Sequence, residues 1–160
     1  MREKLKVLSK QVLNILDKNK LTISTAESCT GGLIAEYITS HSGSSNVFKG
    51  GFVTYSNMSK IKLLNVNKNT ILHFGAVSKE TVNEMSNGAK NILKSDIAIA
   101  VSGIAGPNGG SIEKPVGLVH HSITYQNSHK HTKQIYLGDR ENIRNKTAET
   151  VFKMILEIVI

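Results

Sequence analysis

Ile97-Ala98-Ile99-Ala100-Val101 is an uninterrupted apolar run that ends at Ser102. Such a run, without alternating polar residues, is typical of a central β-strand that is covered on both faces. A loop with four glycines, residues 103–110, follows at once. Ligands of open α/β sheets collect at the carboxyl ends of the strands, so this segment predicts an α/β fold and a binding site that includes Ser102, Gly103 and Gly106.

A second turn, Thr25-Ala-Glu-Ser-Cys-Thr-Gly-Gly32, lies between a short strand pattern and a helical pattern over residues 33–38. Ser28 is then in a strand-to-helix turn. Free backbone N–H groups and the positive end of the helix dipole favour an anion or an oxyanion there. Gly31 and Gly32 have no side chain, so a ligand can approach the backbone of the turn closely. An ordinary Ser/Thr helix cap explains this segment, taken alone, equally well.

Periodicity predicts the remaining elements. We expect helices over residues 3–19, 33–39, 57–64 and 79–93 and from residue 140 onward, and strands over 50–56, 117–124 and 132–137 with a turn at 126–129. The last two strands then form a hairpin, which makes the sheet mixed. Residues 65–73 are expected to be irregular, and Ser78 and Asp139 are expected to cap the helices that follow them.

Length and composition indicate one globular domain over residues 1–160. The chain has 160 residues, of which 39% are hydrophobic and 20% charged, enough for a real core. No apolar run approaches the roughly 20 residues that cross a bilayer, and the first residues lack the apolar core of a signal peptide. Cys29 is the single cysteine, so no internal disulfide forms. These features predict a cytoplasmic protein that does not bind membranes.

The formal net charge of +8 permits a nucleic-acid partner. However, the lysines are scattered and no aromatic residues are interleaved with them to stack bases, so nucleic acid is not the expected partner. The chain has only three arginines, and Arg140 and Arg144 lie one helical turn apart at the start of the last helix. Cations there oppose the helix dipole, a cost that a bound anion or the carboxylate of Asp139 or Glu141 would offset. A phosphate-binding role for at least one of the two arginines is favoured over a surface salt bridge.

A nucleophilic Ser28 needs a base, because a free hydroxyl is almost fully protonated near neutral pH. No histidine stands in a suitable motif. A lysine with a lowered pKa can serve, and a tyrosine hydroxyl can relay or hold the proton. Tyr55 and Lys60 reach Ser28 if the strand before them neighbours the first strand. Lys60 and Lys62 stand two residues apart and cannot share a helix face, so at most one points at the site.

Neither a cofactor nor a metal is expected. The spacing G-x-x-G-x-x-G-G after Ser102 fits neither the Walker loop nor the dinucleotide motif, so ATP and NAD are not supported. His120 and His121 face opposite sides of a strand. His129 and His131 form a second pair, and no Cys or carboxylate cluster completes a ligand set.

Together these motifs resemble the CinA C-terminal domain family, the nicotinamide mononucleotide deamidases. They occur in the family's order and cover nearly the whole chain. The resemblance implies a three-layer α/β/α sandwich with a mixed, mostly parallel sheet. The matching segments are residues 26–32, 51–57 with Lys60, 75–78, 102–110, 114–117 and 138–140 with Arg144.

The resemblance also implies an activity: hydrolysis of nicotinamide mononucleotide to nicotinate mononucleotide and ammonia, in pyridine nucleotide salvage and without a metal. Ser28 would be the nucleophile, Lys60 the general base and Tyr55 an assistant in proton transfer or substrate orientation. The implied substrate-binding residues are Thr30 and Ser102 as hydrogen-bonding hydroxyls, the glycines Gly31, Gly32, Gly103 and Gly106, and Arg140 or Arg144 for the phosphate.

Other interpretations stay open. Many relatives carry an additional N-terminal domain, so a stand-alone form without pyrophosphatase activity is expected. The family's association with competence and DNA damage makes a non-catalytic nucleotide- or DNA-binding protein the alternative. A degenerate enzyme is disfavoured by the joint presence of Ser28, Tyr55 and Lys60. The oligomeric state is open, a homo-oligomer included.

Overall fold

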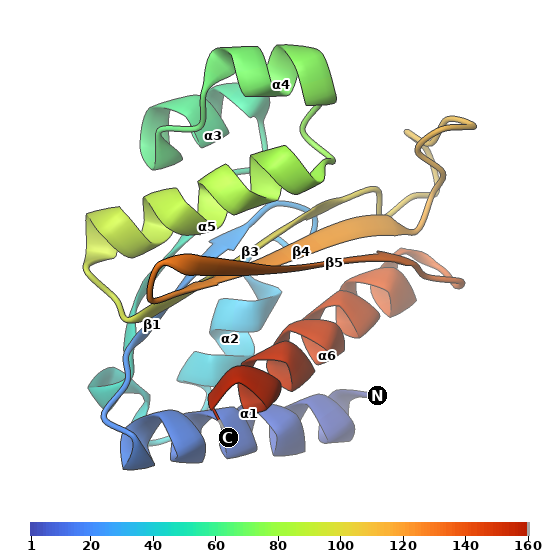
Figure 1. Ribbon diagram of the computed structural model, residues 1–160. Helices are drawn as coiled ribbons and strands as arrows, with labels where there is room; N and C mark the ends of the chain where they lie inside the picture. The colour runs from blue at the N-terminus through green and yellow to red at the C-terminus, as the bar shows by residue number, and fades with distance from the viewer. Residues whose placement is uncertain (160) are drawn as a thin grey trace.

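The computed structural model describes residues 1–159 as a five-stranded sheet with helices on both faces (Figure 1). The strands lie in the order β2-β1-β3-β4-β5. A 3₁₀ turn spans Ser44–Asn46. The strands are β1 (Ile23–Glu27), β2 (Phe48–Val53), β3 (Ile97–Gly103), β4 (Leu118–Tyr125) and β5 (Ser128–Ile135), and the helices are α1 (Arg2–Lys18), α2 (Leu33–Thr39), α3 (Asn57–Leu64), α4 (Lys68–Phe74), α5 (Lys79–Leu93) and α6 (Arg140–Val159).

The sheet is mixed, as predicted. β1 pairs in parallel with both β2 and β3, whereas β3–β4 and β4–β5 are antiparallel pairs. Among the described strands, β4 alone therefore runs against the others. The carboxyl ends of β1, β2 and β3 meet at one edge of the sheet, where ligands of α/β proteins commonly bind.

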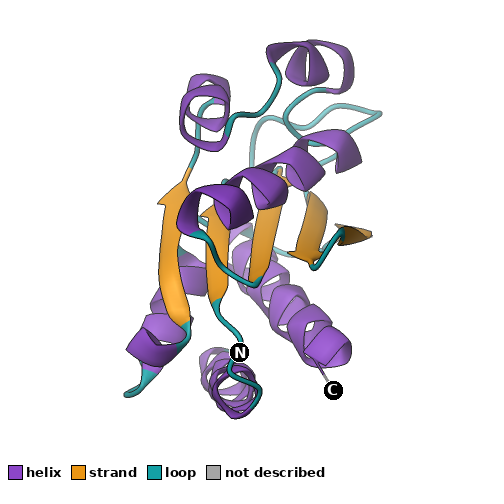
Figure 2. Cartoon of the chain, turned by 60° about the vertical axis from the view of Figure 1, so that its left-hand side comes forward, coloured by secondary structure: helices purple, strands orange, loops and turns teal. Residues whose placement is uncertain are grey.

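Two helical layers enclose the sheet and complete a three-layer sandwich. α1, α2 and α6 cover one face, while α5 lies on the other face with α3 and α4 above it (Figures 1 and 2). The alternation of residues 97–101 fits these layers: Ile97, Ile99 and Val101 pack toward the first layer, and Ala98 and Ala100 pack toward α5. The small side chains let α5 lie close to the central strand, which is buried on both faces as predicted.

Two expectations for the elements were wrong. Residues 65–73, expected to be irregular, contain most of α4, which the Asn67 side chain caps by accepting from the N–H of Asn69 at 2.8 Å. Leu72 is 69% exposed, so the helix lacks the apolar face that periodicity detects. The hairpin turn is also shorter than expected, since β5 begins at Ser128. β5 is an edge strand with mostly exposed side chains, which hides its pattern.

Two predicted helix caps are confirmed. The hydroxyl of Ser78 accepts a hydrogen bond from the N–H of Thr81 at 3.2 Å at the start of α5. A carboxylate oxygen of Asp139 accepts one from the N–H of Asn142 at 2.8 Å at the start of α6. Both caps satisfy N–H groups that have no partner within their helix.

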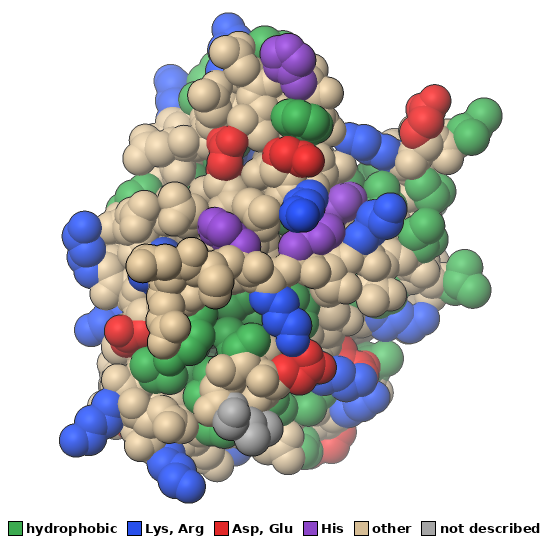
Figure 3. Space-filling model, viewed as in Figure 1, with side chains coloured by type: hydrophobic (Ala, Val, Ile, Leu, Met, Phe, Trp, Pro, Cys, Tyr) green, Lys and Arg blue, Asp and Glu red, His purple; other side chains and the backbone are tan. Residues whose placement is uncertain are grey.

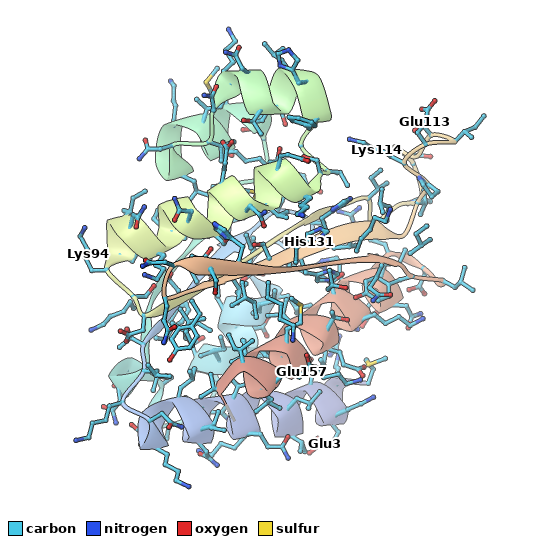
Figure 4. All side chains as sticks on the ribbon, in the orientation of Figure 1. Glu3, Lys94, Glu113, Lys114, His131 and Glu157 are labelled. Atoms are coloured by element: carbon cyan, nitrogen blue, oxygen red, sulfur yellow. The ribbon has the colours of Figure 1, made fainter. Side chains whose placement is uncertain are left out.

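The loop between β3 and β4 projects from the sheet, and Glu113 and Lys114 lie on it (Figure 4). The base of the loop is attached to the α4–α5 connection, because Nζ of Lys114 donates to the carbonyl of Phe74 at 2.6 Å. No helix among residues 1–159 combines the length and the hydropathy that crossing a membrane requires.

Candidate active site

The hydrogen-bond ladder continues beyond the ends of β1 and β2. The N–H of Ser28 donates to the carbonyl of Val101 at 3.1 Å, and the N–H of Thr54 donates to the carbonyl of Glu27 at 2.9 Å. Ser28 therefore lies beside β3 and next to the first residue after β2. It also lies in the predicted strand-to-helix turn, since α2 begins at Leu33.

Lys60 brings its amine to Ser28. Its Nζ is 3.0 Å from Oγ of Ser28, 2.7 Å from the carbonyl oxygen of Thr54 and 3.3 Å from that of Tyr55. Both side chains are buried, with exposed fractions of 1% for Lys60 and 7% for Ser28. The parallel pairing of β1 with β2 brings the two residues together across 32 positions of sequence.

Helix α3 directs Lys60 toward this turn and leaves Lys62 exposed. The hydroxyl of Ser56 caps the helix by accepting from a backbone N–H of its first turn at 3.1 Å. The other end of α3 packs closely on α5: a Cβ at Gly88 would overlap the carbonyl oxygen of Leu64. Only one of the two lysines faces the site, in agreement with the argument from helix faces.

Burial lowers the pKa of the Lys60 amine from 10.5 to about 8 and outweighs a smaller opposing influence of nearby Cys29. A substantial fraction of the amine is then neutral near physiological pH. A neutral amine has two N–H groups and one lone pair. The carbonyl oxygens of Thr54 and Tyr55 can only accept, so they take the N–H groups, and the lone pair is left for the Ser28 hydroxyl. This is the arrangement of a general base.

Glu27 is a fully buried carboxylate that shapes the turn after β1. It accepts a hydrogen bond from the Thr30 hydroxyl at 2.6 Å. It also accepts from the N–H groups of Gly32 and Ile34, both at 3.1 Å, and of Ala35 at 2.9 Å. Three of these donors share Oε2 and the fourth binds Oε1, so Glu27 caps the N-terminus of α2.

This cap changes the interpretation of the turn. The first N–H groups of α2 bind Glu27, so they do not point at a ligand as the sequence suggested. Thr30 likewise uses its hydroxyl inside the protein, in contrast to the expected pocket role. Gly31 and Gly32 adopt left-handed φ values of 60° and 99°, which turn the chain back toward Glu27. Within residues 1–159, the N–H groups of Cys29 and Thr30 have no protein acceptor.

The thiol next to Ser28 does not compete as a nucleophile. Burial, with a smaller contribution from the charge of Glu27, raises the pKa of Cys29 to about 12 against the lowering influence of its own backbone N–H, Lys60 and Arg144. The side chain is only 6% exposed. Because the thiolate is the reactive form, Cys29 behaves as a small apolar core residue.

Both arginines of the α6 start lie beside the site. Arg144 donates through Nη2 to the carbonyl of Thr30 at 2.6 Å. Arg140 donates through Nη1 to the carbonyl of Gly106 at 2.8 Å and through Nη2 to the hydroxyl of Tyr55 at 2.9 Å. Arg144 thus supports the Ser28 turn, and Arg140 connects the segment after β2 with the loop after β3.

Tyr55 lies at the rim. The residue is 61% exposed, and its hydroxyl accepts from Arg140. In the described part of the chain this hydroxyl makes no hydrogen bond to Ser28 or Lys60. Of the two roles expected for Tyr55, this placement suits ligand orientation better than proton relay.

The third wall comes from β3 and the loop after it. Ser102 is 1% exposed and pairs across the sheet with His120. A Cβ at Gly103 would lie 2.6 Å from Cγ2 of Val119, so glycine is needed there for β4 to pack closely. Gly106 presents its carbonyl to an arginine side chain. These residues lie at the carboxyl end of the central strand, where the sequence predicted a site.

The histidines form no metal centre of their own. Nδ1 of His120 is 3.0 Å from Nε2 of His131, whereas Nε2 of His121 is 3.1 Å from the hydroxyl of Tyr136. The neighbours therefore face opposite sides of β4, as strand geometry requires. Among residues 1–159, no group of three or more His, Cys, Asp or Glu side chains is placed to hold a metal ion.

Glu27 is the functional residue that sequence reasoning missed. It appeared only as one letter of a motif and received no role. The signal was present, because a carboxylate at the end of a buried strand and before a Ser-Cys-Thr-Gly-Gly turn has few partners other than the turn itself. A buried carboxylate needs such donors, and here the turn and α2 supply them.

Comparisons with known proteins agree with this geometry. The family model described as the CinA C-terminal domain matches residues 5–159. A CinA-like protein of Petrotoga mobilis is 48% identical over 154 residues, which are 96% of this chain and 38% of that protein. A CinA-like protein of Kosmotoga olearia is 50% identical over 142 residues, which are 88% of this chain and 34% of that protein. The chain spans little more than a third of the length of these curated relatives.

A solved structure has the same fold. The crystal structure of the competence/damage inducible protein CihA from Agrobacterium tumefaciens superposes with a TM-score of 0.94 at 42% sequence identity. The match covers 96% of this chain and 94% of that one. The sheet order and the helical layers described above are therefore those of an experimentally observed architecture.

Proposed function

The chain belongs to the CinA C-terminal domain family, and from this premise we propose that it is an amidohydrolase that converts nicotinamide mononucleotide to nicotinate mononucleotide and ammonia. One observation carries the proposal: the amine of Lys60, with its pKa lowered to about 8, lies 3.0 Å from the hydroxyl of Ser28. A lysine in this state can activate a serine without a histidine or a metal.

In the first half of the reaction, Oγ of Ser28 attacks the carboxamide carbon while the neutral amine of Lys60 takes the hydroxyl proton. The C–O bond forms and the carbonyl oxygen becomes an oxyanion. The intermediate then collapses, the C–N bond breaks, and Lys60 returns the proton to the departing nitrogen as ammonia leaves. The product is a nicotinoyl ester on Ser28.

In the second half, Lys60 takes a proton from a water molecule that attacks the ester carbon. The second tetrahedral intermediate expels Oγ of Ser28, which receives the proton back from Lys60. Nicotinate mononucleotide is released and the enzyme is restored. The amine of Lys60 acts first as a base and then as an acid in each half of the reaction. A pKa close to the working pH favours this double role.

The oxyanion is best assigned to the N–H groups of Cys29 and Thr30, which have no protein acceptor within residues 1–159. Glu27 holds the turn that carries them. Loss of one oxyanion donor typically lowers the rate by about 10² to 10³. The positions of these groups support a serine acyl-transfer mechanism without requiring the dipole of α2.

The substrate phosphate is best assigned to Arg140. It is exposed at the rim and already orients the Tyr55 hydroxyl, whereas Arg144 holds the Thr30 carbonyl behind the turn. A guanidinium bound to a phosphate gains charge-assisted hydrogen bonds in a fixed geometry. Tyr55 and Ser102 would then border the nicotinamide ribose between the phosphate and Ser28.

The direct test measures ammonia release from nicotinamide mononucleotide by the wild type and by Ser28→Ala. We expect release by the wild type and loss of at least about 10³-fold in kcat for the variant, because the nucleophile is absent. Cys29→Ala serves as the matched control next to Ser28 and should keep most of the activity. No release by the wild type from the mononucleotide or the riboside would disprove the proposal.

The alternative is a non-catalytic protein that binds nucleic acid. The net charge of +8 favours it, and the description of the Agrobacterium protein as competence/damage inducible is consistent with it. Ser28→Ala separates the two functions, since this change should abolish ammonia release but leave phosphate-backbone binding unaltered.

A further inference from the structure

Thr54 has a fully buried hydroxyl that forms no hydrogen bond within the protein. The residue is 0% exposed, and its Oγ1 has no partner among residues 1–159. Within this part of the chain, Oγ1 of Thr25 is the only other buried side-chain atom in this situation. Buried polar groups are normally paired, because an unpaired hydroxyl costs free energy. A hydroxyl in such a place therefore calls for a partner that is not part of the chain.

The backbone of Thr54 already belongs to the candidate active site. Its carbonyl oxygen accepts from Nζ of Lys60 at 2.7 Å. Its N–H donates to the carbonyl of Glu27 at 2.9 Å, which extends the parallel register of β1 and β2 by one residue and places Thr54 beside Ser28. Thr54 is thus a direct neighbour of both members of the serine–lysine pair.

The side chain of Thr54 lies on the same face of the sheet as that of Ser28. Ala26 and Phe52 are paired two residues earlier on β1 and β2, and both pack in the core under α5. Side chains alternate along extended chains, so Ser28 and Thr54 face this side as well. Helix α3, which carries Lys60, lies on the same side (Figure 1). The unpaired hydroxyl therefore belongs with Ser28 and Lys60 and not with the layer of α1, α2 and α6.

The second half of the proposed reaction needs an acceptor at this place. Before the reaction, the Ser28 hydroxyl uses the lone pair of the neutral Lys60 amine. The ester has no hydrogen on Oγ, so the lone pair becomes available to a water molecule. A water whose two hydrogens both go to fixed acceptors keeps its own lone pairs for the ester carbon. Lys60 supplies one acceptor, and the hydroxyl of Thr54 is a second one beside it that no other donor occupies among residues 1–159.

We propose that Thr54 positions the water that hydrolyses the nicotinoyl ester, an inference that rests on the proposed deamidase function. Oγ1 of Thr54 accepts one hydrogen of the water, and Nζ of Lys60 removes the other as the water oxygen bonds to the ester carbon. The bond from that carbon to Oγ of Ser28 then breaks, and Lys60 returns the proton to Oγ. The hydrogen on the side of Thr54 stays on the new carboxyl group, which ionises in solution.

Thr54→Val tests this role, because valine keeps the shape of the side chain and removes only the hydroxyl. Ammonia leaves before the ester is hydrolysed, so rapid-quench measurement of the first ammonia per enzyme reports on acylation alone. We expect this first ammonia at the wild-type rate within about twofold and a steady-state rate at least about tenfold lower. The ester on Ser28 should then accumulate and be visible by intact mass spectrometry.

Thr54→Ser separates positioning from packing. Serine keeps the hydroxyl but loses a buried methyl group, so we expect lower stability and a steady-state rate within about threefold of the wild type. Valine should leave stability unchanged or raise it, since the hydroxyl that it removes is unpaired. Chemical denaturation and steady-state kinetics give the two orders. A purely structural role of Thr54 predicts that serine harms activity more than valine, which is the opposite order.

Thr25→Val is the matched control, because it removes the other unpaired hydroxyl of the same type. Thr25 lies on β1 beside Gly51, where a Cβ would overlap its Oγ1. It is separated from Ser28 by an odd number of positions and so lies on the opposite face of the sheet. We expect this variant to keep the first-ammonia rate and the steady-state rate of the wild type.

The proposal is overturned if Thr54→Val turns over like the wild type, or if it slows the first ammonia as much as the later turnovers. A crystal structure of the wild type distinguishes this from failure of the proposed function. We expect an ordered water within hydrogen-bond distance of Oγ1 of Thr54, and its absence at high resolution would overturn the role of Thr54 alone. No ammonia release by the wild type would overturn the deamidase function and this step with it.

Discussion

Lys60 combines two properties that a general base needs and that rarely occur together in a lysine. Its amine is buried at 1% exposure, and its contacts are oxygen atoms that tolerate a neutral amine. Burial without these contacts would leave polar hydrogens unpaired, and contacts without burial would leave the pKa near 10.5. The local environment of one residue therefore decides whether this site can use a serine.

The pH dependence of the activity follows from the sign of this shift. In the proposed mechanism the neutral form of Lys60 is the active one, and its pKa is lowered to about 8. We expect kcat/KM for the mononucleotide to rise about tenfold per pH unit below pH 7 and to level off above about pH 8. Steady-state rates between pH 6 and 9.5 check this. A flat profile over that range would argue against Lys60 as the base.

Cys29 provides a second prediction at the same scale. Burial raises its pKa to about 12, so the native protein holds an unreactive thiol. Labelling with a thiol reagent at pH 8 should be slow in the native protein and complete in denaturant. Fast labelling of the native protein, accompanied by loss of activity that substrate prevents, would instead assign chemistry to Cys29.

At the scale of elements, the Ser28 turn depends on a carboxylate and not on the dipole of the following helix. Glu27 binds four donors, three of them backbone N–H groups at the start of α2. The turn and the helix are thereby joined into one unit. This explains how Ser28 keeps its position although its neighbours Gly31 and Gly32 are conformationally permissive.

Glu27→Gln tests this role. The amide keeps the size of the side chain but replaces one acceptor oxygen with N–H groups that face other donors. We expect the free energy of unfolding to fall by about 2–4 kcal/mol and kcat to fall more than KM changes, because the oxyanion turn loosens. Chemical denaturation and steady-state kinetics measure the two effects.

Glu36→Gln is the matched control, because Glu36 lies on α2, the helix that Glu27 caps, but outside the hydrogen bonds of the turn. It should leave stability within about 0.5 kcal/mol of the wild type. Equal effects of the two substitutions would show that the turn does not rely on Glu27.

At the scale of the whole molecule, the excess positive charge has two separate parts. The lysines lie singly over the surface, with acidic and histidine side chains between them on the face seen in Figure 3. The three arginines instead line one cleft between α1, α2 and α6. The net charge of +8 is therefore distributed in two ways: most lysines are scattered over the surface, and the arginines line one cleft. On the face seen in Figure 3, the basic side chains form no continuous surface along which a duplex could bind.

We therefore expect binding to double-stranded DNA only in the non-specific range, with Kd of about 10⁻⁴ to 10⁻⁶ M that weakens steeply with salt. Fluorescence anisotropy of a labelled duplex between 50 and 200 mM salt checks this, with protein concentrations that span the expected Kd. Tight binding that persists at the higher salt and is unaffected by Ser28→Ala would favour the nucleic-acid alternative.

Much of the fold could be read from local patterns. The central strand at 97–101 was recognised because burial on both faces leaves a continuous apolar run, and the helices with an apolar face were recognised by their period. α4 and the start of β5 were not recognised, because residues such as Leu72 are exposed and the apolar residues there do not follow the period of a buried face. Local periodicity reports burial, so elements at the periphery are the ones it misses.

The sequence by itself determined which residues were available for chemistry: Ser28 in its turn, Tyr55 and Lys60 after a strand, and an arginine pair at a helix start. Only the tertiary structure decided how they act. Parallel pairing of β1 with β2 brought Lys60 to 3.0 Å from Ser28, and burial lowered its pKa. The tertiary structure also turned the start of α2 onto Glu27 and placed Arg2 along the same cleft as the arginine pair. Distances and desolvation depend on strand order and helix packing, which join residues far apart in the chain and leave no local pattern in the sequence.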